Sequence, residues 1–421
     1  MTPDSAAQRP DLTAEAPSTS TIGHQAVPGS DGRGWSRITA IGTRVSGQVT
    51  DRLGERRGGE RRGSGRRRGR AEGQVVPDAS FTSYYGRPVV KPSPWEADIP
   101  TYLFLGGLAA GSSLLGAGAD LSDRPVLRRA GRIGALGAIT FSMVALVRDL
   151  GKPSRFVNML RVVKPTSPMS VGTWILTAYG PGAGVAGAAE LARLLPIRLG
   201  LAGRLLDGAA RPAGLAAALF APGVASYTGV LLSDTATPAW HDAHRELPFL
   251  FAASAAAASG GFGMLSAPVR EAGPARRMAV GGALVELAVE QAMEKSMGLS
   301  AETLHTGTPG RLMKASKALT AAGALGTLLG GRNRVVAAAS GVALMAGSAC
   351  TRFGVFEAGQ HSARDPKYTV VPQRERVERR RAAADRSTST VAQQSTKQQQ
   401  PPEQQGTDQH TAAPDSEEAH Q

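Results

Sequence analysis

Residues 101–119 of the 421-residue chain read TYLFLGGLAAGSSLLGAGA. This block contains no charged side chain and consists mainly of Gly, Ala, Leu and Ser. An α-helix rises about 1.5 Å per residue, so about 20 such residues cross the hydrocarbon core of a bilayer. The stretch therefore predicts a membrane-spanning helix over about 99–119, and the same pattern recurs along the chain.

Seven further apolar blocks follow, separated by short polar connections. They lie at about 131–147, 169–191, 213–232, 247–265, 278–297, 319–329 and 335–350. Gly and Ala recur in these blocks, and small residues allow helix backbones to approach closely in lipid. The chain is therefore expected to be all-α, a polytopic membrane protein with about eight transmembrane helices.

Two polar tails, 1–94 and 357–421, flank this expected transmembrane domain of residues 95–356. The tails are rich in Pro, Ser, Gln, Gly and charge, and they are poor in aromatic residues. Such segments cannot bury enough apolar surface to offset the entropy of ordering, so both tails are expected to be largely disordered. They also explain a mean hydropathy of only −0.14.

The N-terminal tail contains nine arginines between positions 52 and 70. No aromatic residue lies among them, which favours contact with anionic lipid over nucleic-acid binding. The first 35 residues contain no apolar segment typical of a secretory signal. Cationic residues are nearly balanced between the two sets of loops, so they do not decide the orientation. The missing export signal favours a protein of the cell membrane with both tails in the cytoplasm.

The cysteine and histidine positions limit the cofactors that this chain can hold by itself. A single cysteine, Cys350, excludes a disulfide framework and a self-contained iron–sulfur or zinc-thiolate site. All seven histidines fall in expected tails or loops, whereas a membrane cytochrome b needs axial imidazoles inside the bundle. Neither haem nor an iron–sulfur cluster is therefore expected here, and no metal site is predicted.

Polar and aromatic side chains gather where the first span begins, in the sequence WEADIPTY at 95–102. Trp95 and Tyr102 are typical of the aromatic belt at a membrane edge. The carboxylates of Glu96 and Asp98 beside them could relay protons to an acceptor in the membrane. Tyr227 lies inside the fourth span, where a phenol can donate a hydrogen bond to a quinone carbonyl or to a neighbouring helix.

A polar segment, DLGKPSRFVNMLRVVKPTSP at 149–168, separates the second and third spans. Its polar residues Asp149, Lys152, Arg155 and Asn158 are interrupted by apolar and aromatic ones. This mixture predicts a short helix in the plane of the membrane interface, where it would cover a pocket or dock a partner. An ordinary interfacial loop is the alternative.

Three carboxylates, Glu286, Glu290 and Glu294, recur at every fourth residue on the sixth span. This spacing places them on one face of the helix. Such a row suits a proton path or polar pairing between helices, and the residues alone leave both open. A proton- or ion-translocating protein that uses this face is the rival hypothesis, although no internal repeat of the transporter kind is evident.

Three stretches together resemble the NrfD/polysulfide reductase membrane-subunit family. They are WEADIPTYLFLGGLAAG at 95–111, DLGKPSRFVNMLRVVKPTSPMSVGTW at 149–174 and YTGVLLSDTATPAWHDAHRELPFLFAASAAAASG at 227–260. The middle stretch is the most specific, and the resemblance covers roughly residues 95–356. The ending RFGVFEAGQHSARDPKYTVVPQR is similar to that of actinobacterial members.

The resemblance implies eight transmembrane helices in two four-helix bundles. It also implies a site for a quinone, menaquinone, beside an iron–sulfur (ferredoxin-like) subunit, with a molybdopterin oxidoreductase subunit beyond. The chain would then be a membrane anchor that passes electrons between the iron–sulfur partner and menaquinone. A purely structural anchor without quinone chemistry is a third hypothesis.

The resemblance assigns expected roles to two groups of residues. Quinone contacts and proton relay are expected from Trp95, Glu96, Asp98, Tyr102 and Tyr227. The residues expected to shape the pocket or the partner interface are Asp149, Lys152, Arg155, Asn158 and Trp174. Some relatives use Asn and His near the first span, and this chain has neither there.

Overall fold

The structure is a computed structural model that describes residues 88–196 and 199–398, with side chains as far as residue 387. Most of the predicted N-terminal tail, up to residue 87, and the end of the chain from residue 399 lie outside these ranges. Within them every regular element is a helix, which confirms the all-α prediction.

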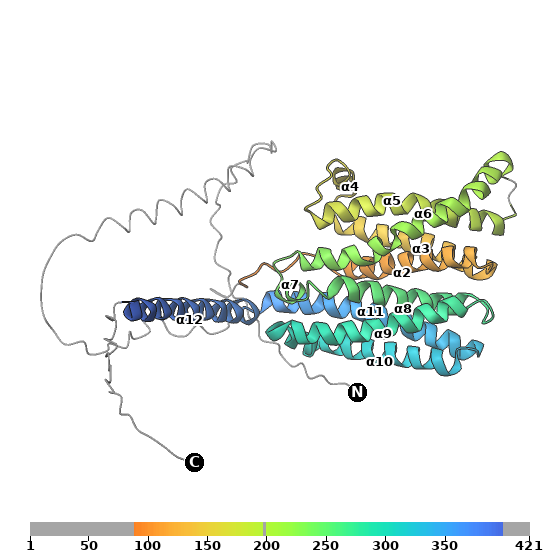
Figure 1. The fold of residues 1–421 in the computed structure, drawn as a ribbon. Coiled ribbons are helices and arrows are strands. Elements are labelled where there is room, and N and C mark those ends of the chain that lie inside the picture. The colour runs from red at the N-terminus through yellow and green to blue at the C-terminus, as the bar shows by residue number, and fades with distance from the viewer. Residues whose placement is uncertain (1–87, 197–198, 399–421) are drawn as a thin grey trace, which may run out of the picture. The chain divides into compact units, whose positions relative to one another are not determined.

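Eight of the long helices in the described part of the chain form two groups of four (Figure 1). The first group contains α2 (Asp98–Leu121), α3 (Pro125–Asp149), α5 (Pro168–Leu194) and α6 (Gly200–Ser233). The second contains α8 (Leu247–Ser266), α9 (Gly273–Ser296), α10 (Gly307–Gly330) and α11 (Arg334–Arg364). The two groups meet where α2 packs on α8 and α11, and where α6 packs on α8. This arrangement agrees with the expected pair of four-helix bundles.

Each of the eight predicted spans coincides with one of these helices, and the sixth, at about 278–297, extends one residue past the end of α9. Five of them, α2, α3, α6, α8 and α11, are long and apolar enough to cross a membrane by length and composition. The short block at 319–329 belongs to α10, which begins at Gly307, much earlier than the apolar pattern indicates. The extra turns carry Lys317, which pairs with glutamates of α9, so contacts with a neighbour extend the helix.

Small residues set the distance between neighbouring helices. A Cβ added to Gly131 of α3 would lie 2.7 Å from the backbone nitrogen of Gly116 of α2. A Cβ on Gly261 of α8 would lie 2.6 Å from the carbonyl oxygen of Gly341 of α11. Both distances are shorter than van der Waals contact, so only glycine allows the backbones to pack this closely.

Ion pairs link the helices of the first group at the end where α2 finishes. The carboxylate of Glu190 on α5 is fully buried and lies 3.0 Å from guanidinium nitrogens of Arg128, Arg132 and Arg193. Arg132 also bonds Asp120 of α2 at 3.1 Å. Charges removed from water are tolerated when they are paired in this way.

The opposite end of the molecule, where α2 begins and α11 ends, carries four short helices. They are η1 (Pro153–Arg155), α4 (Phe156–Met159), α7 (Pro238–Asp242) and η2 (Gly298–Leu304). The side-chain amide of Gln360 on α11 donates to the carbonyl oxygens of Ser93 and Trp95, at 3.0 and 3.1 Å. Both ends of the transmembrane domain therefore lie on one face.

The structure corrects the predicted C-terminal boundary. Helix α11 continues past residue 356 to Arg364, and α12 occupies Lys367–Gln398. The structure thus has helix over most of residues 357–398, a part of the chain that was expected to be largely disordered. The reason lies in packing: a Cβ on Gly359 would lie only 2.0 Å from the indole of Trp240 on α7, so α11 fits tightly against that short helix. Tyr368 at the start of α12 is only 3% exposed.

Candidate functional site

A small pocket lies at the end of the first bundle where α2 begins. It has a volume of about 100 Å³ and lies between α2, α3, α5 and α6. Four of the residues singled out in the sequence line it: Trp95, Tyr102, Asp149 and Tyr227. The remaining lining is apolar apart from Thr173, and includes Ile99, Leu146, Leu150, Met159, Leu176 and Leu231.

Two buried phenols define the polar character of this pocket. Tyr102 of α2 is 3% exposed and Tyr227 of α6 is 7% exposed. Neither hydroxyl has a hydrogen-bond partner within residues 88–196 and 199–387. Tyr179, a third buried phenol in the same bundle, instead bonds the hydroxyl of Ser113 and the carbonyl oxygen of Ala109, both at 2.8 Å. Because buried hydroxyls are normally bonded, the two pocket tyrosines are suited to bind a ligand that carries acceptor oxygens.

Close packing fixes the positions of both tyrosines. A Cβ on Gly172 of α5 would lie 2.4 Å from Cδ2 and Cε2 of Tyr227, so the ring occupies the space that this glycine leaves. On α2, the carbonyl oxygen of Tyr102 accepts a hydrogen bond from Ser142 of α3 at 3.0 Å. Gly172 lies in the motif SPMSVGTW, but its role in seating Tyr227 was not predicted.

Trp95 forms part of the pocket wall and is held from the second bundle. Its ring stacks on that of Trp240, with ring centroids 6.0 Å apart. The ring of Trp240 in turn packs against that of Phe356, with centroids 5.6 Å apart. The indole nitrogen of Trp240 donates to the carbonyl oxygen of Val355 at 2.8 Å. Together with the bonds from Gln360, these contacts position the segment that precedes α2.

The predicted carboxylates divide between the pocket and its rim. Asp149, the last residue of α3, lines the pocket and is partly buried. Asp98 lies outside the lining, 3.9 Å from Nε of Arg148, and Glu96 is exposed. Both are close enough to act electrostatically on Asp149. The three carboxylates therefore extend from the pocket toward the surface.

The polar segment after α3 is folded into the short helices η1 and α4. Lys152, Arg155 and Asn158 are exposed and do not line the pocket. The side chain of their apolar neighbour Met159 does line the pocket. Trp174 also lies outside the pocket, where its indole nitrogen is 3.4 Å from the carbonyl oxygen of Val162 and ties the segment to α5.

The glutamates of α9 lie in the second bundle, apart from this pocket. Glu286 accepts a hydrogen bond from Thr351 of α11 at 2.7 Å, and Thr351 is 2.6 Å from Ser316 of α10. Glu290 is 1% exposed, and its carboxylate lies 3.9 Å from Lys317. The same lysine bonds Glu294 at 2.6 Å. The row thus connects three helices through polar contacts.

The described part of the chain contains no group of three or more His, Cys, Asp or Glu residues placed to hold a metal ion. His241 and His244 lie in or directly after α7, where their rings stack with centroids 5.8 Å apart. His361, expected in a tail, is in the last turn of α11 and contacts the ring of Tyr368.

Comparison with known proteins places the chain in a family. The profile described as Polysulphide reductase, NrfD matches residues 89–301, just over half of the 421 residues. The chain belongs to the polysulphide reductase NrfD family. A search for similar curated proteins found no match.

Membership of the NrfD family makes the chain a polytopic membrane subunit of an oxidoreductase complex. Members generally pair with iron–sulfur and molybdopterin subunits. Every residue that lines the pocket lies within the matched region. Helix α11, which supplies Gln360 to the backbone of Trp95, lies by contrast wholly beyond residue 301.

Sequence reasoning missed the apolar half of the pocket. Met159, Leu176 and Leu231 look like any other apolar residue on a membrane helix, so no local signal marks them. Met159 had the best available signal, since it lies in the apolar run RFVNML within an otherwise polar segment.

Proposed function

We propose that the pocket binds the head group of menaquinone and that this chain is the quinone-interacting membrane anchor of its complex. It would pass electrons between an iron–sulfur partner and the quinone pool. The observation that carries the proposal is the pair of buried, unpartnered phenols, Tyr102 and Tyr227, in an apolar pocket at the membrane edge. A quinone is a flat, largely apolar ring with carbonyl oxygens that accept hydrogen bonds, and it suits such a pocket.

Reduction of a quinone to a quinol takes up two electrons and two protons, and oxidation releases them. The electrons would come from or go to the iron–sulfur partner. Tyr102 and Tyr227 would donate hydrogen bonds to the carbonyl oxygens and orient the ring. Asp149 would exchange protons with the bound ring and pass them to Asp98 and Glu96 at the rim.

The exposed side of the polar segment suits the docking of the partner. Lys152, Arg155 and Asn158 are exposed beside the pocket, on the face that carries both ends of the transmembrane domain. We place the ferredoxin-like iron–sulfur subunit on this face, with the molybdopterin subunit beyond it. Trp174 would stabilise the interface by holding the segment on α5. The chain would lie in the cell membrane with this face and both tails in the cytoplasm.

The test is quinol-linked turnover of the purified complex that carries Tyr102→Phe or Tyr227→Phe. Loss of a neutral hydrogen bond costs about 0.5–1.5 kcal/mol, so KM for the quinol should rise by about 2- to 13-fold for each variant. Tyr179→Phe is the matched control, because its hydroxyl bonds within the bundle and should affect thermal stability but not KM. Unchanged KM and kcat in both pocket variants would refute the quinone site.

The contacts of Glu286, Glu290 and Glu294 support polar pairing between helices of the second bundle. Glu286 and Glu294 each bond a partner on another helix, and Glu290 faces Lys317. A proton path along this face stays an untested alternative, and the family match favours the quinone-linked function over an ion transporter.

A further inference from the structure

A second cavity adjoins the head-group pocket in the first bundle. It has a volume of about 160 Å³ and lies between α3, α4 and α5. Leu146, Met159, Thr173 and Leu176 line both it and the pocket with the two tyrosines. Because these four residues line both spaces, the cavity and the pocket are neighbours in one largely apolar region.

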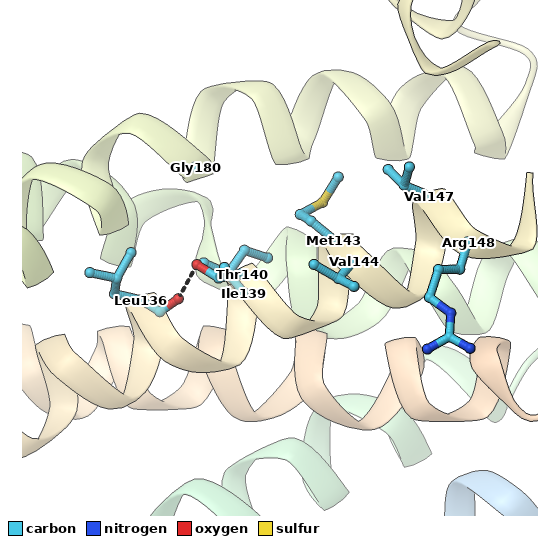
Figure 2. Close-up of a pocket in the computed structure, with 8 residues that line it drawn as sticks. All are labelled: Leu136, Ile139, Thr140, Met143, Val144, Val147, Arg148 and Gly180. Atoms are coloured by element: carbon cyan, nitrogen blue, oxygen red, sulfur yellow. Dashed lines mark hydrogen bonds between the residues drawn. The ribbon is translucent and has the colours of Figure 1, made fainter. Parts of the chain in front are cut away.

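This cavity in turn adjoins a larger groove between α3 and α5. The groove has a volume of about 520 Å³ and shares Ile139, Met143 and Gly180 with the cavity. Figure 2 shows its α3 side chains, with Gly180 on α5 facing them. A Cβ on Gly180 would meet no atom within 4 Å beyond its chain neighbours, so the glycine lies against open space.

The groove is apolar along almost its whole length. The hydroxyl of Thr140 donates to the carbonyl oxygen of Leu136 at 2.7 Å, so this side chain is satisfied within its own helix (Figure 2). The one charged lining residue, Arg148, is at the membrane edge, where it pairs with Asp98. From Arg148 to Leu136 the groove follows α3 for roughly 18 Å at about 1.5 Å per residue. It therefore runs from the membrane edge toward the middle of the bilayer.

We infer that the α3–α5 groove binds the polyisoprenoid tail of the quinone whose head group occupies the pocket. This inference rests on the proposed quinone function. A head group at the membrane edge needs an apolar exit that leads toward the bilayer centre, and the adjoining cavity and groove of the first bundle provide it. In lipid a hydrocarbon chain is held by van der Waals packing and not by removal from water, and the apolar side chains along the groove offer such packing without any polar contact.

The test substitutes a groove residue and compares two quinols on the purified complex. Val144→Trp fills the groove from α3, where Val144 is 51% exposed. Val342→Trp on α11 is the matched control, because Val342 is 52% exposed on another apolar helix and does not line the groove. The substrates are menaquinol with its full tail and a tail-less naphthoquinol.

Val144→Trp should raise KM for the long-tailed quinol severalfold, because the indole would occupy the space that the tail needs beside α3. KM for the tail-less quinol should stay within twofold of the wild type, and Val342→Trp should change neither. Unchanged KM for the long-tailed quinol, or an equal rise for both quinols, would overturn the inference. The first of these results would also indicate that the groove holds only lipid acyl chains.

A second measurement uses the unmodified complex and does not depend on folding of a variant. A menaquinone analogue with a photoreactive diazirine on its second isoprene unit should label peptides of α3 or α5 around Met143 and Gly180. Labelling confined to other helices would overturn the inference. Failure of the quinone site itself is distinguishable, because Tyr227→Phe should impair both quinols whereas Val144→Trp should impair only the long-tailed one.

Discussion

The contact between Gly172 and Tyr227 gives the sharpest test of how the pocket is built. In Gly172→Ala the new methyl group would lie 2.4 Å from two ring carbons of Tyr227. Ordinary contact of this kind begins near 3.4 Å, so the ring or α5 must move by 3.4 − 2.4 = 1.0 Å. Overpacking of this sort destabilises a protein by about 1–3 kcal/mol. It also moves the hydroxyl of Tyr227 out of hydrogen-bonding range of a bound ring.

The expected result is a fall in kcat/KM for menaquinol of about tenfold or more, which combines a lost hydrogen bond with a misplaced substrate. The complex should still assemble, because the added atom is a single methyl group in a helix. Gly118→Ala on α2 is the control, since a Cβ there meets nothing within 4 Å. It should leave both stability and kcat/KM unchanged.

A double-mutant cycle separates an effect through Tyr227 from a general disturbance. In the Tyr227→Phe background the hydroxyl is already absent, so Gly172→Ala should lower kcat/KM by less than it does in the wild type. Wild-type kcat/KM in Gly172→Ala would refute the reasoning that this glycine seats the ring. Fully additive losses would show that the glycine acts elsewhere.

Four further predictions concern other parts of the molecule. Asp149→Asn should lower kcat of menaquinol-coupled turnover by about tenfold or more with normal assembly, because it removes the proposed proton acceptor; full turnover would contradict that role. Arg155→Glu should weaken retention of the iron–sulfur subunit in a pull-down at low salt, and the difference from the wild type should shrink as the salt concentration rises, because salt screens exposed charges; retention equal to the wild type at low salt would argue against docking there. Gly359→Ala should lower thermal stability in detergent by an equivalent of about 1–3 kcal/mol, because its Cβ would lie 2.0 Å from Trp240, and an unchanged melting temperature would show that α7 can move away. Glu286→Gln should keep quinol turnover near the wild-type rate if the carboxyl serves helix pairing, and a large loss of turnover would favour a proton path instead.

The arrangement of the helices could be predicted largely from sequence because membrane helices are self-contained. Each backbone group bonds within its own helix, so length and hydropathy alone identify a span. The predicted ends of the helices are wrong where tertiary contacts extend a helix beyond its apolar part. Helix α10 begins at Gly307 because Lys317 pairs with α9, and α11 continues to Arg364 because Gly359 packs on Trp240. The partners in these contacts are distant in sequence, so local composition does not predict the contacts.

The pocket could be predicted only through its polar and aromatic members. Tyr102, Tyr227 and Asp149 are unusual residues for a membrane helix or its end, and all three line the pocket. Glu96 and Asp98 are equally unusual but lie outside the pocket lining, Glu96 before the start of α2 and Asp98 at its first residue. The glycine that seats Tyr227 could not be told from the many glycines that serve packing between helices.

Gln360 has a consequence for how far the molecule can be shortened. The family profile ends at residue 301, and all residues that touch the pocket precede that point. Yet the carbonyl oxygen of Trp95 in the pocket wall accepts a hydrogen bond from the side-chain amide of Gln360. The ring of Trp95 also stacks on that of Trp240, whose indole nitrogen donates to the carbonyl oxygen of Val355. A chain cut after residue 301 would retain every pocket residue and lose the contacts that hold Trp95 in the pocket wall. The pocket lies in the first bundle, but contacts from the second half of the chain help to set its shape.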